Sequence, residues 1–555
     1  MSTRHLQHWP RHLATHLDVP ETSLWYNAEV SAARFPHKPY LVFYDTEVSF
    51  SQFRDEAEKV AGFLQQRCGV KKGDRVLLYM QNCPQFAIAY YGILRADAVV
   101  VPVNPMNLTD ELRHYVDDAD ATTAIVAQEL YPRIAPLTGK ASGAGLSHVI
   151  VAAYSDYATA PTTLNVPDFV AAPRQTIADP GVSSWMDVIA HDLRPGPHTA
   201  GPDDLCVMPY TSGTTGKPKG CMHSHRTVMS TAVGGAHWFA VYSDCVFLSV
   251  VPLFHVTGMQ GAMNGTLYSG NTVILLPRWE RDAAARCIHK YRVTSWTAIP
   301  PMIFDLLAHP QLAEFDLSSM RRLSGGGAAM PEAVAQQLLD RGITYVEGYG
   351  LSETIAPSHI NPPDRPKKQC LGIPIFDVDA RVLDPSSLAE LPVDEVGEIV
   401  IHGPQVFLGY WKNDRATADS FIELDGKRFF RTGDLGRVDQ DGYFFMVDRL
   451  KRMINASGFK VWPAEVESML FEHPSVREAC VVAARDPRRG ETVKAIVVLR
   501  DADDPLTEAQ FLEWCHQKMA AYKAPRIVEF VEQLPRSGTG KILWRALQEQ
   551  ELARS

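Results

Sequence analysis

Short apolar runs alternate with stretches of helical periodicity over much of the first 370 residues. The runs 75–80, 99–103 and 123–126 have the length of buried strands, whereas 84–94 and 111–116 place apolar residues at helical spacing. Strands separated by helices in this way usually pair in parallel, with helices on the faces of the sheet. The pattern therefore predicts an α/β fold with large, doubly wound sheets.

The alternation continues after residue 205 and is interrupted at two earlier places. Residues 40–53 predict a short hairpin, after which we expect Ser51 to cap a helix over 52–68. The stretch 137–197 is rich in Ala, Pro, Thr and Gly, so we expect it to form surface excursions. Further strands are predicted at 205–208, 246–251, 273–276, 295–299 and 344–347.

The pattern changes twice beyond residue 370. Short alternating strands and turns between Gly372 and Gly409 predict a small β-barrel-like subdomain. After Arg449 a new succession of helices and strands begins, which is typical of a compact α+β domain. We therefore predict an N-terminal domain over 1–449 and a C-terminal domain over 450–555.

Composition narrows the class of protein. A chain of 555 residues is too long for one core, and its 46% hydrophobic and 21% charged residues are ordinary for a globular protein. The net charge of −10 argues against nucleic acid as the main partner. Nine scattered cysteines without a C-x-x-C pair favour a reduced, cytoplasmic protein that lacks structural zinc.

Membrane insertion is not expected from this sequence. The first twenty residues contain no apolar leader, and the longest apolar run, 86–103, is interrupted by Arg95 and Asp97. This run predicts a buried helix followed by a strand. Peripheral membrane association and a homodimer are left open by the sequence.

Residues 210–220 form the most informative stretch, and read Tyr-Thr-Ser-Gly-Thr-Thr-Gly-Lys-Pro-Lys-Gly. Glycines let backbone N–H groups point into one concavity, while hydroxyls and lysines add donors and positive charge, so the loop suits phosphate. Only two residues separate Gly213 from Gly216, and Pro218 follows Lys217, which excludes a Walker A loop. A flexible surface loop is the alternative, although such dense clustering is rare in loops.

Five motifs follow one another along the chain, at 210–220, 349–354, 431–434, 448–451 and 535–541. Their order and spacing resemble the acyl-adenylate-forming enzymes, which include acyl-CoA synthetases, firefly luciferase and nonribosomal adenylation domains. The resemblance extends from about residue 25 to about residue 545. It implies attack of a carboxylate on the α-phosphate of ATP, release of pyrophosphate, and transfer of the acyl group to CoA.

The resemblance assigns the ATP and metal contacts. Glu353, together with Thr211, is expected to hold Mg²⁺, and Ser352 to donate to the α-phosphate. Asp434 and Arg449 are expected to contact the ribose. The remaining ATP contacts are expected from the loop and from the adenine slot: Ser212, Gly213, Thr214, Thr215, Gly216, Lys217, Gly327, Ala328, Tyr349 and Gly350.

The resemblance also implies a mobile C-terminal domain. Lys541 corresponds to the lysine that reaches the reacting oxygens during adenylation, and Lys451 to the hinge residue. Gly458 is expected to line the tunnel for the pantetheine arm of CoA, and Lys460 to bind the CoA end. Asn455 stands where some relatives carry lysine, which argues against luciferase-type oxidation.

The acid is expected to bind near His255, which resembles the gate between the ATP side and the acyl pocket. Small and flexible apolar residues suit an alkyl chain, so we expect a medium- or long-chain fatty acid. An aryl acid is the alternative, followed by a luciferase-type monooxygenase or a non-catalytic relative. The expected acyl-pocket residues are Gly258, Met259, Gly261 and Met302.

Overall fold

The computed structural model forms two compact units. The large unit comprises the described residues up to Asp379 together with Ile401–Phe430, and the small unit comprises Ala380–Val400 and the described residues from Arg431 onwards. The described part of the chain is 3–139, 145–211, 217–326, 330, 332–456, 459–486, 490–501, 506–537 and 542–554.

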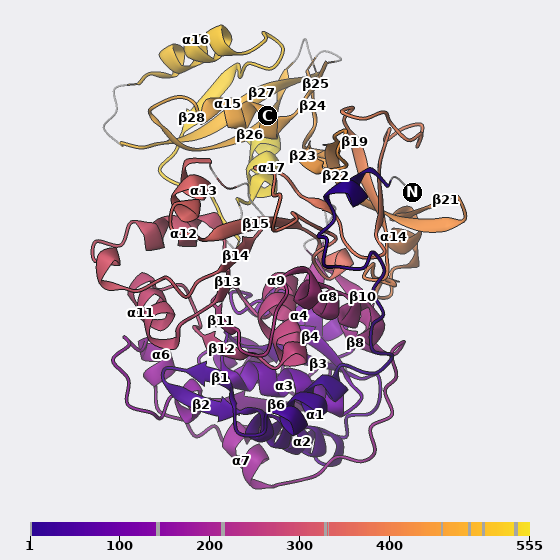
Figure 1. The fold of residues 1–555 in the computed structure, drawn as a ribbon, viewed down its shortest axis with the longest axis vertical. Helices are drawn as coiled ribbons and strands as arrows, with labels where there is room; N and C mark the ends of the chain where they lie inside the picture. The colour runs from indigo at the N-terminus through magenta and orange to yellow at the C-terminus, as the bar shows by residue number, and fades with distance from the viewer. Residues whose placement is uncertain are drawn as a thin grey trace. The chain divides into compact units, whose positions relative to one another are not determined.

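A nine-stranded sheet that is parallel at its centre forms one layer of the large unit (Figure 1). Its order is β20-β10-β8-β4-β3-β5-β6-β7, and β9 pairs with β10. The strands are β3 (Arg75–Tyr79), β4 (Val99–Pro102), β5 (Thr123–Ala127), β6 (His148–Ala152), β7 (Val182–Ser184), β8 (Leu205–Val207), β9 (Tyr210–Thr211), β10 (Lys219–Ser224) and β20 (Gly409–Tyr410).

A second nine-stranded sheet has the order β17-β16-β15-β14-β13-β11-β12-β1-β2. Its six central strands are parallel, and the strands at both edges are antiparallel. The strands are β1 (Pro39–Phe43), β2 (Thr46–Ser49), β11 (Val246–Ser249), β12 (Thr272–Leu275), β13 (Ser295–Thr297), β14 (Arg322–Gly325), β15 (Thr344–Tyr349), β16 (His359–Ile360) and β17 (Ile373–Pro374).

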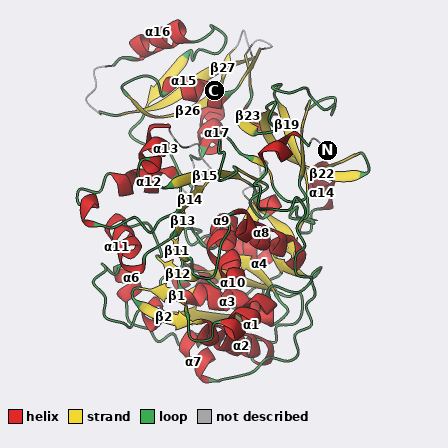
Figure 2. Cartoon of the chain, in the orientation of Figure 1, coloured by secondary structure: helices red, strands yellow, loops and turns green. Residues whose placement is uncertain are grey.

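Helices connect the parallel strands, as Figure 2 shows by colour. A π-helix at Met259–Asn264 follows the short helix α9 (Val256–Gly258). The other α-helices of the large unit are α1 (Trp25–Arg34), α2 (Phe50–Gln66), α3 (Pro84–Arg95), α4 (Thr109–Asp118), α5 (Tyr131–Ile134), α6 (Asp168–Ala171), α7 (Trp185–Ala190), α8 (His225–Trp238), α10 (Gly265–Ser269), α11 (Arg281–Tyr291), α12 (Pro300–Leu307), α13 (Glu332–Leu339) and α14 (Asp414–Asp419).

The structure confirms the predicted alternation and corrects it at two points. Ser49, not Ser51, caps α2: its hydroxyl accepts from Gln52 N–H, whereas Ser51 donates to the carbonyl of Pro36. The stretch 137–197 was expected to lie outside the sheets, but β6 and β7 extend the first sheet there. The apolar run of β6 is short and lies in an Ala- and Thr-rich context, which obscures its pattern.

A third sheet of five strands follows the order β18-β19-β22-β21, and β23 pairs with β22. The boundary between the two units falls within β18, β19 and β22. The strands are β18 (Asp379–Leu383), β19 (Gly397–His402), β21 (Phe421–Leu424), β22 (Lys427–Val438) and β23 (Phe444–Arg449).

The C-terminal part of the small unit is α+β and has a core of its own. Its sheet has the order β25-β24-β27-β26, and β28 pairs with β27. The elements are β24 (Ile454–Ala456), β25 (Phe459–Val461), α15 (Pro463–Leu470), β26 (Val476–Asp486), β27 (Gly490–Leu499), α16 (Glu508–Lys518), β28 (Ile527–Phe530) and α17 (Trp544–Arg554).

These elements confirm the predicted fold class. The predicted domain boundary at 449/450 stays a prediction. The two compact units divide the chain at 379/380, 400/401 and 430/431. Among the described residues, no helix has both the length and the apolarity needed to cross a membrane.

Candidate active site

Two antiparallel strands form the stem of the Gly-, Ser- and Thr-rich loop. In the ladder between β9 and β10, Thr211 lies opposite Lys219, and Tyr210 lies opposite Gly220. Lys217 is exposed at the end of the loop. The predicted phosphate contacts at 212–216 lie outside the described residues, between β9 and β10 in the sequence.

Side chains of helix α4 anchor this stem. The hydroxyl of Tyr210 donates to Asp118 Oδ2 over 2.6 Å, and its ring packs against Tyr115 at 4.5 Å. His114 Nε2 donates to the carbonyl of Pro218 over 2.7 Å. Burial raises the pKa of Tyr210, so its phenol stays protonated and remains a donor.

The predicted metal ligand Glu353 lies in a strained turn at the end of β15. It belongs to a 3₁₀ turn, Ser352–Thr354, and its side chain is buried. The two residues that follow, Ile355 and Ala356, have positive φ angles of 43° and 30°. Such conformations are costly for non-glycine residues and often mark functional sites.

Residues 407–411 hold this turn and the loop stem. Tyr410 donates from its hydroxyl to Glu353 Oε1 over 2.8 Å, and Phe407 N–H donates to the Glu353 carbonyl over 2.8 Å. The ammonium of Lys219 lies 3.9 Å from the centroid of the Tyr410 ring. Sequence analysis missed this segment, because nothing in the local sequence distinguishes Tyr410 from an ordinary buried aromatic residue.

His223 provides a second support for the turn. Its Nε2 donates to the carbonyl of Ser352 over 2.7 Å. Burial lowers the pKa of His223 to about 4, although the bond to Ser352 opposes this shift. The imidazole is therefore neutral at pH 7, and it acts as a hydrogen-bond donor rather than as a cation beside the nucleotide loop.

The residues around Glu353 fit a magnesium ion. Among the described residues, no group of three or more His, Cys, Asp and Glu side chains could hold a metal. A divalent ion at Glu353 stays a prediction, and the other protein ligand that we predict for it is the hydroxyl of Thr211. Mg²⁺ is commonly bound in this way, through one or two carboxylates and the substrate phosphates.

Tyr349 and Gly350, predicted for the nucleotide, lie at the end of β15. The ring of Tyr349 is 5.7 Å from that of His359 on β16, with an angle of 59° between the planes. A Cβ on Gly350 would lie 2.8 Å from Cα of Ala356, so only glycine allows the chain to pass here. The predicted adenine contacts Gly327 and Ala328 lie outside the described residues.

The predicted gate and two of the acyl-pocket residues have local structural roles. His255 caps α9, where its Nδ1 accepts from Thr257 N–H over 3.3 Å. A Cβ on Gly258 would lie 2.3 Å from the Pro252 carbonyl oxygen, so backbone packing explains this glycine. Met259 is fully buried in the core. The roles of these residues toward an acid remain predictions.

The other two acyl-pocket residues are accessible. Gly261 is exposed, although Gln260 and Ala262 beside it are buried. A Cβ at Gly261 would lie 3.3 Å from Thr297 Oγ1. Met302, on α12, is half-buried. Gly261 thus lies beside the hydroxyl of Thr297, the last residue of β13.

The small unit brings the two predicted ribose contacts together. Asp434 and Arg449 are partners in the ladder of β22 and β23, and Arg449 Nε lies 2.9 Å from Asp434 Oδ1. Asp434 is only 1% exposed. The pair could offer a carboxylate and a guanidinium to a diol.

The predicted hinge residue Lys451 lies exposed in a 3₁₀ turn, Leu450–Arg452, directly after β23. Lys460 lies in β25. Gly458 and Lys541 lie outside the described residues, so their predicted roles rest on the motifs alone.

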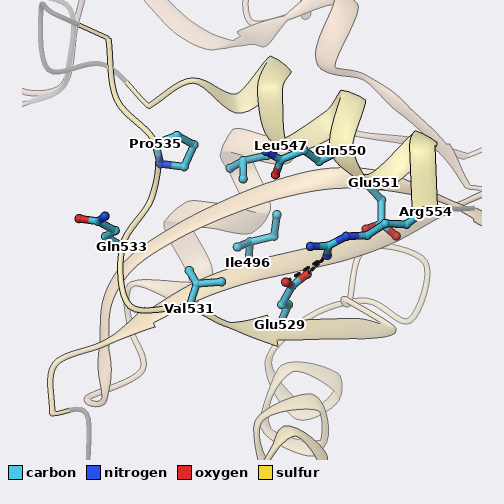
Figure 3. A pocket seen from close by; sticks show the side chains of 9 residues that line it. All are labelled: Ile496, Glu529, Val531, Gln533, Pro535, Leu547, Gln550, Glu551 and Arg554. Atoms are coloured by element: carbon cyan, nitrogen blue, oxygen red, sulfur yellow. Dashed lines mark hydrogen bonds and ion pairs between the residues drawn. The ribbon is translucent and has the colours of Figure 1, made fainter.

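One pocket lies in the α+β part of the small unit and has a volume of about 310 Å³ (Figure 3). Ile496, Val531 and Leu547 line it with apolar atoms, and Arg554 donates to Glu529 at one end over 3.0 Å. No residue that we predicted for the site lines this pocket.

Two parts of the chain match known protein families. Residues 28–411 match the family described as AMP-binding enzyme, and residues 465–541 match its C-terminal domain. The chain belongs to the AMP-binding enzyme family. The first match spans the loop stem, His255 and Glu353, and the second ends at Lys541.

Individual relatives agree with this family. The chain is 34% identical to a long-chain-fatty-acid–CoA ligase of Bacillus subtilis (strain 168), over 98% of each chain. It is also 34% identical to a feruloyl-CoA synthase of Amycolatopsis sp, over 92% of this chain and 95% of that protein. The crystal structure of the anthranilate CoA ligase AuaEII with anthranoyl-AMP superposes with a TM-score of 0.81, at 26% identity, over 97% and 99% of the two chains.

The family and its relatives define the reaction class. The protein is an AMP-forming acid–thiol ligase, for which ATP and CoA are substrates. The resemblance read from the five motifs is thereby confirmed, whereas the roles of single residues remain predictions.

Proposed function

We propose that this ligase activates a medium- or long-chain fatty acid as the acyl-adenylate and then transfers the acyl group to CoA. The observation that carries this choice of acid is the 34% identity to a long-chain-fatty-acid–CoA ligase over 98% of both chains. The accessible Gly261 and the half-buried thioether of Met302 are compatible with an alkyl chain.

In the proposed adenylation step, the loop at 211–217 holds the departing pyrophosphate, and Ser352 donates to the α-phosphate. Glu353 and Thr211 would hold Mg²⁺, which offsets the charge that builds on the phosphate oxygens when bound. The strained turn and its supports keep the carboxylate of Glu353 in place before the nucleotide arrives.

The C-terminal residues act in sequence in this proposal. Asp434 and Arg449 bind the ribose, and Lys541 reaches the reacting oxygens during adenylation. Rotation at Lys451 then moves Lys541 away from the acyl-adenylate and brings the CoA tunnel to it. In this tunnel Gly458 leaves room for the pantetheine arm, and Lys460 binds the CoA end.

A substrate panel tests the proposed acid. Saturated acids of increasing chain length and a set of aryl acids are incubated with ATP, Mg²⁺ and CoA, and AMP and thioester are measured. We expect the highest kcat/KM for an alkyl acid of medium or long chain. A maximum for aryl acids would overturn the proposed acid while leaving the ligase class intact.

Lys541→Ala tests the proposed division of labour. Because only adenylation needs this lysine, we expect pyrophosphate release to be abolished while CoA transfer from pre-made acyl-adenylate continues. An equal loss in both half-reactions would contradict the mobile-lysine role.

An aryl acid that carries an oxygen substituent is the second candidate, and a pair of hydroxyls favours it. Thr297 and Ser324 are neighbours across β13 and β14, and their hydroxyl oxygens are 3.2 Å apart. Their mutual bond uses one proton and leaves one hydroxyl donor for an oxygen on the acid. Thr297 Oγ1 is also the atom that a Cβ built on Gly261 would meet, at 3.3 Å, which places one hydroxyl of the pair beside a predicted acyl-pocket residue.

We also propose a cytoplasmic location. No disulfide joins the nine cysteines, all of which lie among the described residues. Cell fractionation tests the location and any peripheral membrane association, and light scattering tests the homodimer.

A further inference from the structure

The carboxylate of Glu353 has a buried protein partner that no motif predicts. Tyr410 is only 5% exposed, and its hydroxyl donates to Glu353 Oε1 over 2.8 Å. Glu353 itself is 7% exposed. A buried hydrogen bond of this length restrains the position of the carboxylate oxygen.

The ring of the same tyrosine contacts the loop stem. Lys219 Nζ lies 3.9 Å from the ring centroid, a distance at which a cation is attracted to the face of an aromatic ring. Lys219 is the strand partner of Thr211, the other predicted metal ligand. One side chain therefore links the stem that carries Thr211 to the turn that carries Glu353.

The backbone fixes Tyr410 between these two groups. Tyr410 is the partner of Cys221 in the ladder of β20 and β10, and Trp411 N–H donates to the Gly220 carbonyl over 2.8 Å. Phe407 packs against the ring at 4.8 Å. Because strand and core both hold the ring, its hydroxyl and its face are presented in fixed directions.

We propose that Tyr410 is a positioning residue that pre-orients Glu353 for Mg²⁺ and Lys219 for the nucleotide phosphates. This inference rests on the proposed metal role of Glu353. Partners that orient a metal ligand typically change metal affinity about 10- to 100-fold when they are removed. The two contacts use different parts of the side chain, so substitutions can separate them.

Tyr410→Phe removes the hydroxyl and keeps the ring under Lys219. We expect the Mg²⁺ concentration for half-maximal acid-dependent ATP–pyrophosphate exchange to rise about 10-fold or more, while KM for the acid is unchanged. EPR can follow Mn²⁺ binding in the presence of a non-hydrolysable ATP analogue, a measurement that needs no turnover. The affinity for Mn²⁺ should weaken by a similar factor. Tyr410→Leu also removes the ring, and should in addition raise KM for ATP.

Two further variants make the result decisive. Glu353→Gln should weaken Mn²⁺ binding at least as strongly as Tyr410→Phe. Tyr157→Phe is a matched control, since Tyr157 donates to a buried carboxylate, Glu56, outside the predicted site over 2.5 Å; we expect unchanged metal dependence. Melting temperatures verify that each variant is folded.

The outcomes separate the two proposals. Wild-type metal dependence in Tyr410→Phe, together with weakened binding in Glu353→Gln, would overturn the positioning role alone. Wild-type metal binding in both variants would overturn the metal role of Glu353, and the inference with it. A loss in the Tyr157→Phe control equal to that in Tyr410→Phe would mean that the effect is general loss of stability.

Discussion

Ile355 and Ala356 adopt left-handed backbone conformations immediately after Glu353, with φ of 43° and 30°. Such residues typically cost about 1–3 kcal/mol each, and persist only where the surroundings over-determine them. Here the surroundings are the close passage at Gly350 and the bonds from Phe407 and Tyr410. These contacts fix the turn that carries Glu353, the carboxylate that we predict to hold the metal.

The hydroxyl pair Thr297 and Ser324 leads to a prediction about acid preference. We expect Thr297→Val with Ser324→Ala to lower kcat/KM for oxygenated aryl acids about 2- to 10-fold, the effect of losing one typical hydrogen bond of about 0.5–1.5 kcal/mol. The same change should maintain or raise kcat/KM for alkyl acids, because it removes two polar groups from the predicted acyl pocket. Steady-state kinetics with matched alkyl and aryl acids measure the ratio.

Ser319→Ala is the control for this variant, since its hydroxyl donates to the Val293 carbonyl. An unchanged ratio of alkyl to aryl kcat/KM in the double variant would show that the pair does not meet the acid.

Asp97 leads to a prediction about acid stability. His198 Nδ1 lies 2.6 Å from its carboxylate, and Thr199 donates both its N–H and its hydroxyl. Burial alone would raise the pKa of Asp97, but the interactions with His198 and Thr199 outweigh it and hold the pKa well below its usual range. This stabilisation is therefore fully present above the unfolded pKa of about 3.9 and is lost as pH falls toward the folded pKa.

We expect Asp97→Asn to destabilise the protein at pH 7 by about 3 kcal/mol, the low end for breaking a buried pair. The difference in melting temperature between wild type and variant should shrink as pH is lowered from 5 to 3. Thermal melts at half-unit pH steps measure it, and a difference that stays constant over this range would contradict the assignment.

At the scale of elements, long periodic segments and short edge strands behave differently. Helices such as α2 and α3 and strands such as β3 and β5 are set by local apolar spacing, and they occur where the pattern predicts them. Strands β16, β17 and β20 have two residues each, too few for a period to be visible. One of these, β20, nevertheless carries Tyr410.

The junction of β23 and α15 leads to a prediction about the two half-reactions. Asp448 is buried, and its Oδ2 accepts from Ala464 N–H, in the first turn of α15, over 2.7 Å. Its Oδ1 lies 3.7 Å from Arg452. These contacts join the strand before Lys451 to residues after it, so rotation at Lys451 would disrupt them.

We therefore expect Asp448→Asn to destabilise the conformation in which Asp448 contacts Ala464 and Arg452. The equilibrium should then shift toward conformations that are rotated at Lys451. Pyrophosphate exchange and thioester formation from pre-made adenylate should then change in opposite directions, and the ratio of the two rates should change about 10-fold for a shift of about 1.4 kcal/mol. Asp394→Asn, at the Arg437 pair on the surface of the same unit, is the control. A parallel fall in both half-reactions would argue for simple loss of stability.

At the scale of the whole molecule, two separate apolar cores predict unfolding in more than one step. Phe511 is fully buried in the core of the C-terminal part, where its ring lies 5.9 Å from that of Phe530. Phe53 is equally buried in the core of the large unit, 4.8 Å from the ring of Tyr40. Multi-domain proteins commonly depart from two-state unfolding.

We expect Phe511→Ala to lower the midpoint temperature of the transition that reports the C-terminal core, since such truncations cost about 3–5 kcal/mol. The midpoint of the other transition should not change. Phe53→Ala should do the converse. Differential scanning calorimetry measures both. If each variant shifts one common transition, the two cores unfold as a single cooperative unit.

Local patterning determined much of this protein. The spacing of apolar residues specified the parallel strands and their helices, because periods of 2 and 3.6 depend only on near neighbours. The ordered motifs specified the reaction class, because loop glycines, hydroxyls and charged residues are chosen for the phosphates and ribose they contact. Thr211, Glu353, Asp434 and Arg449 are predicted as contacts in this way, and their roles stay predictions.

Tertiary structure alone decided what holds these residues. The partner of Glu353 is 57 positions away in the sequence, and Tyr210 bonds to Asp118 across 92 positions. Neither contact leaves a local signal, because a buried tyrosine has the same sequence context in an apolar core as beside a buried carboxylate. Strand order and the inclusion of β6 and β7 in the sheet were likewise settled by pairing between distant segments, which depends on packing of the whole chain.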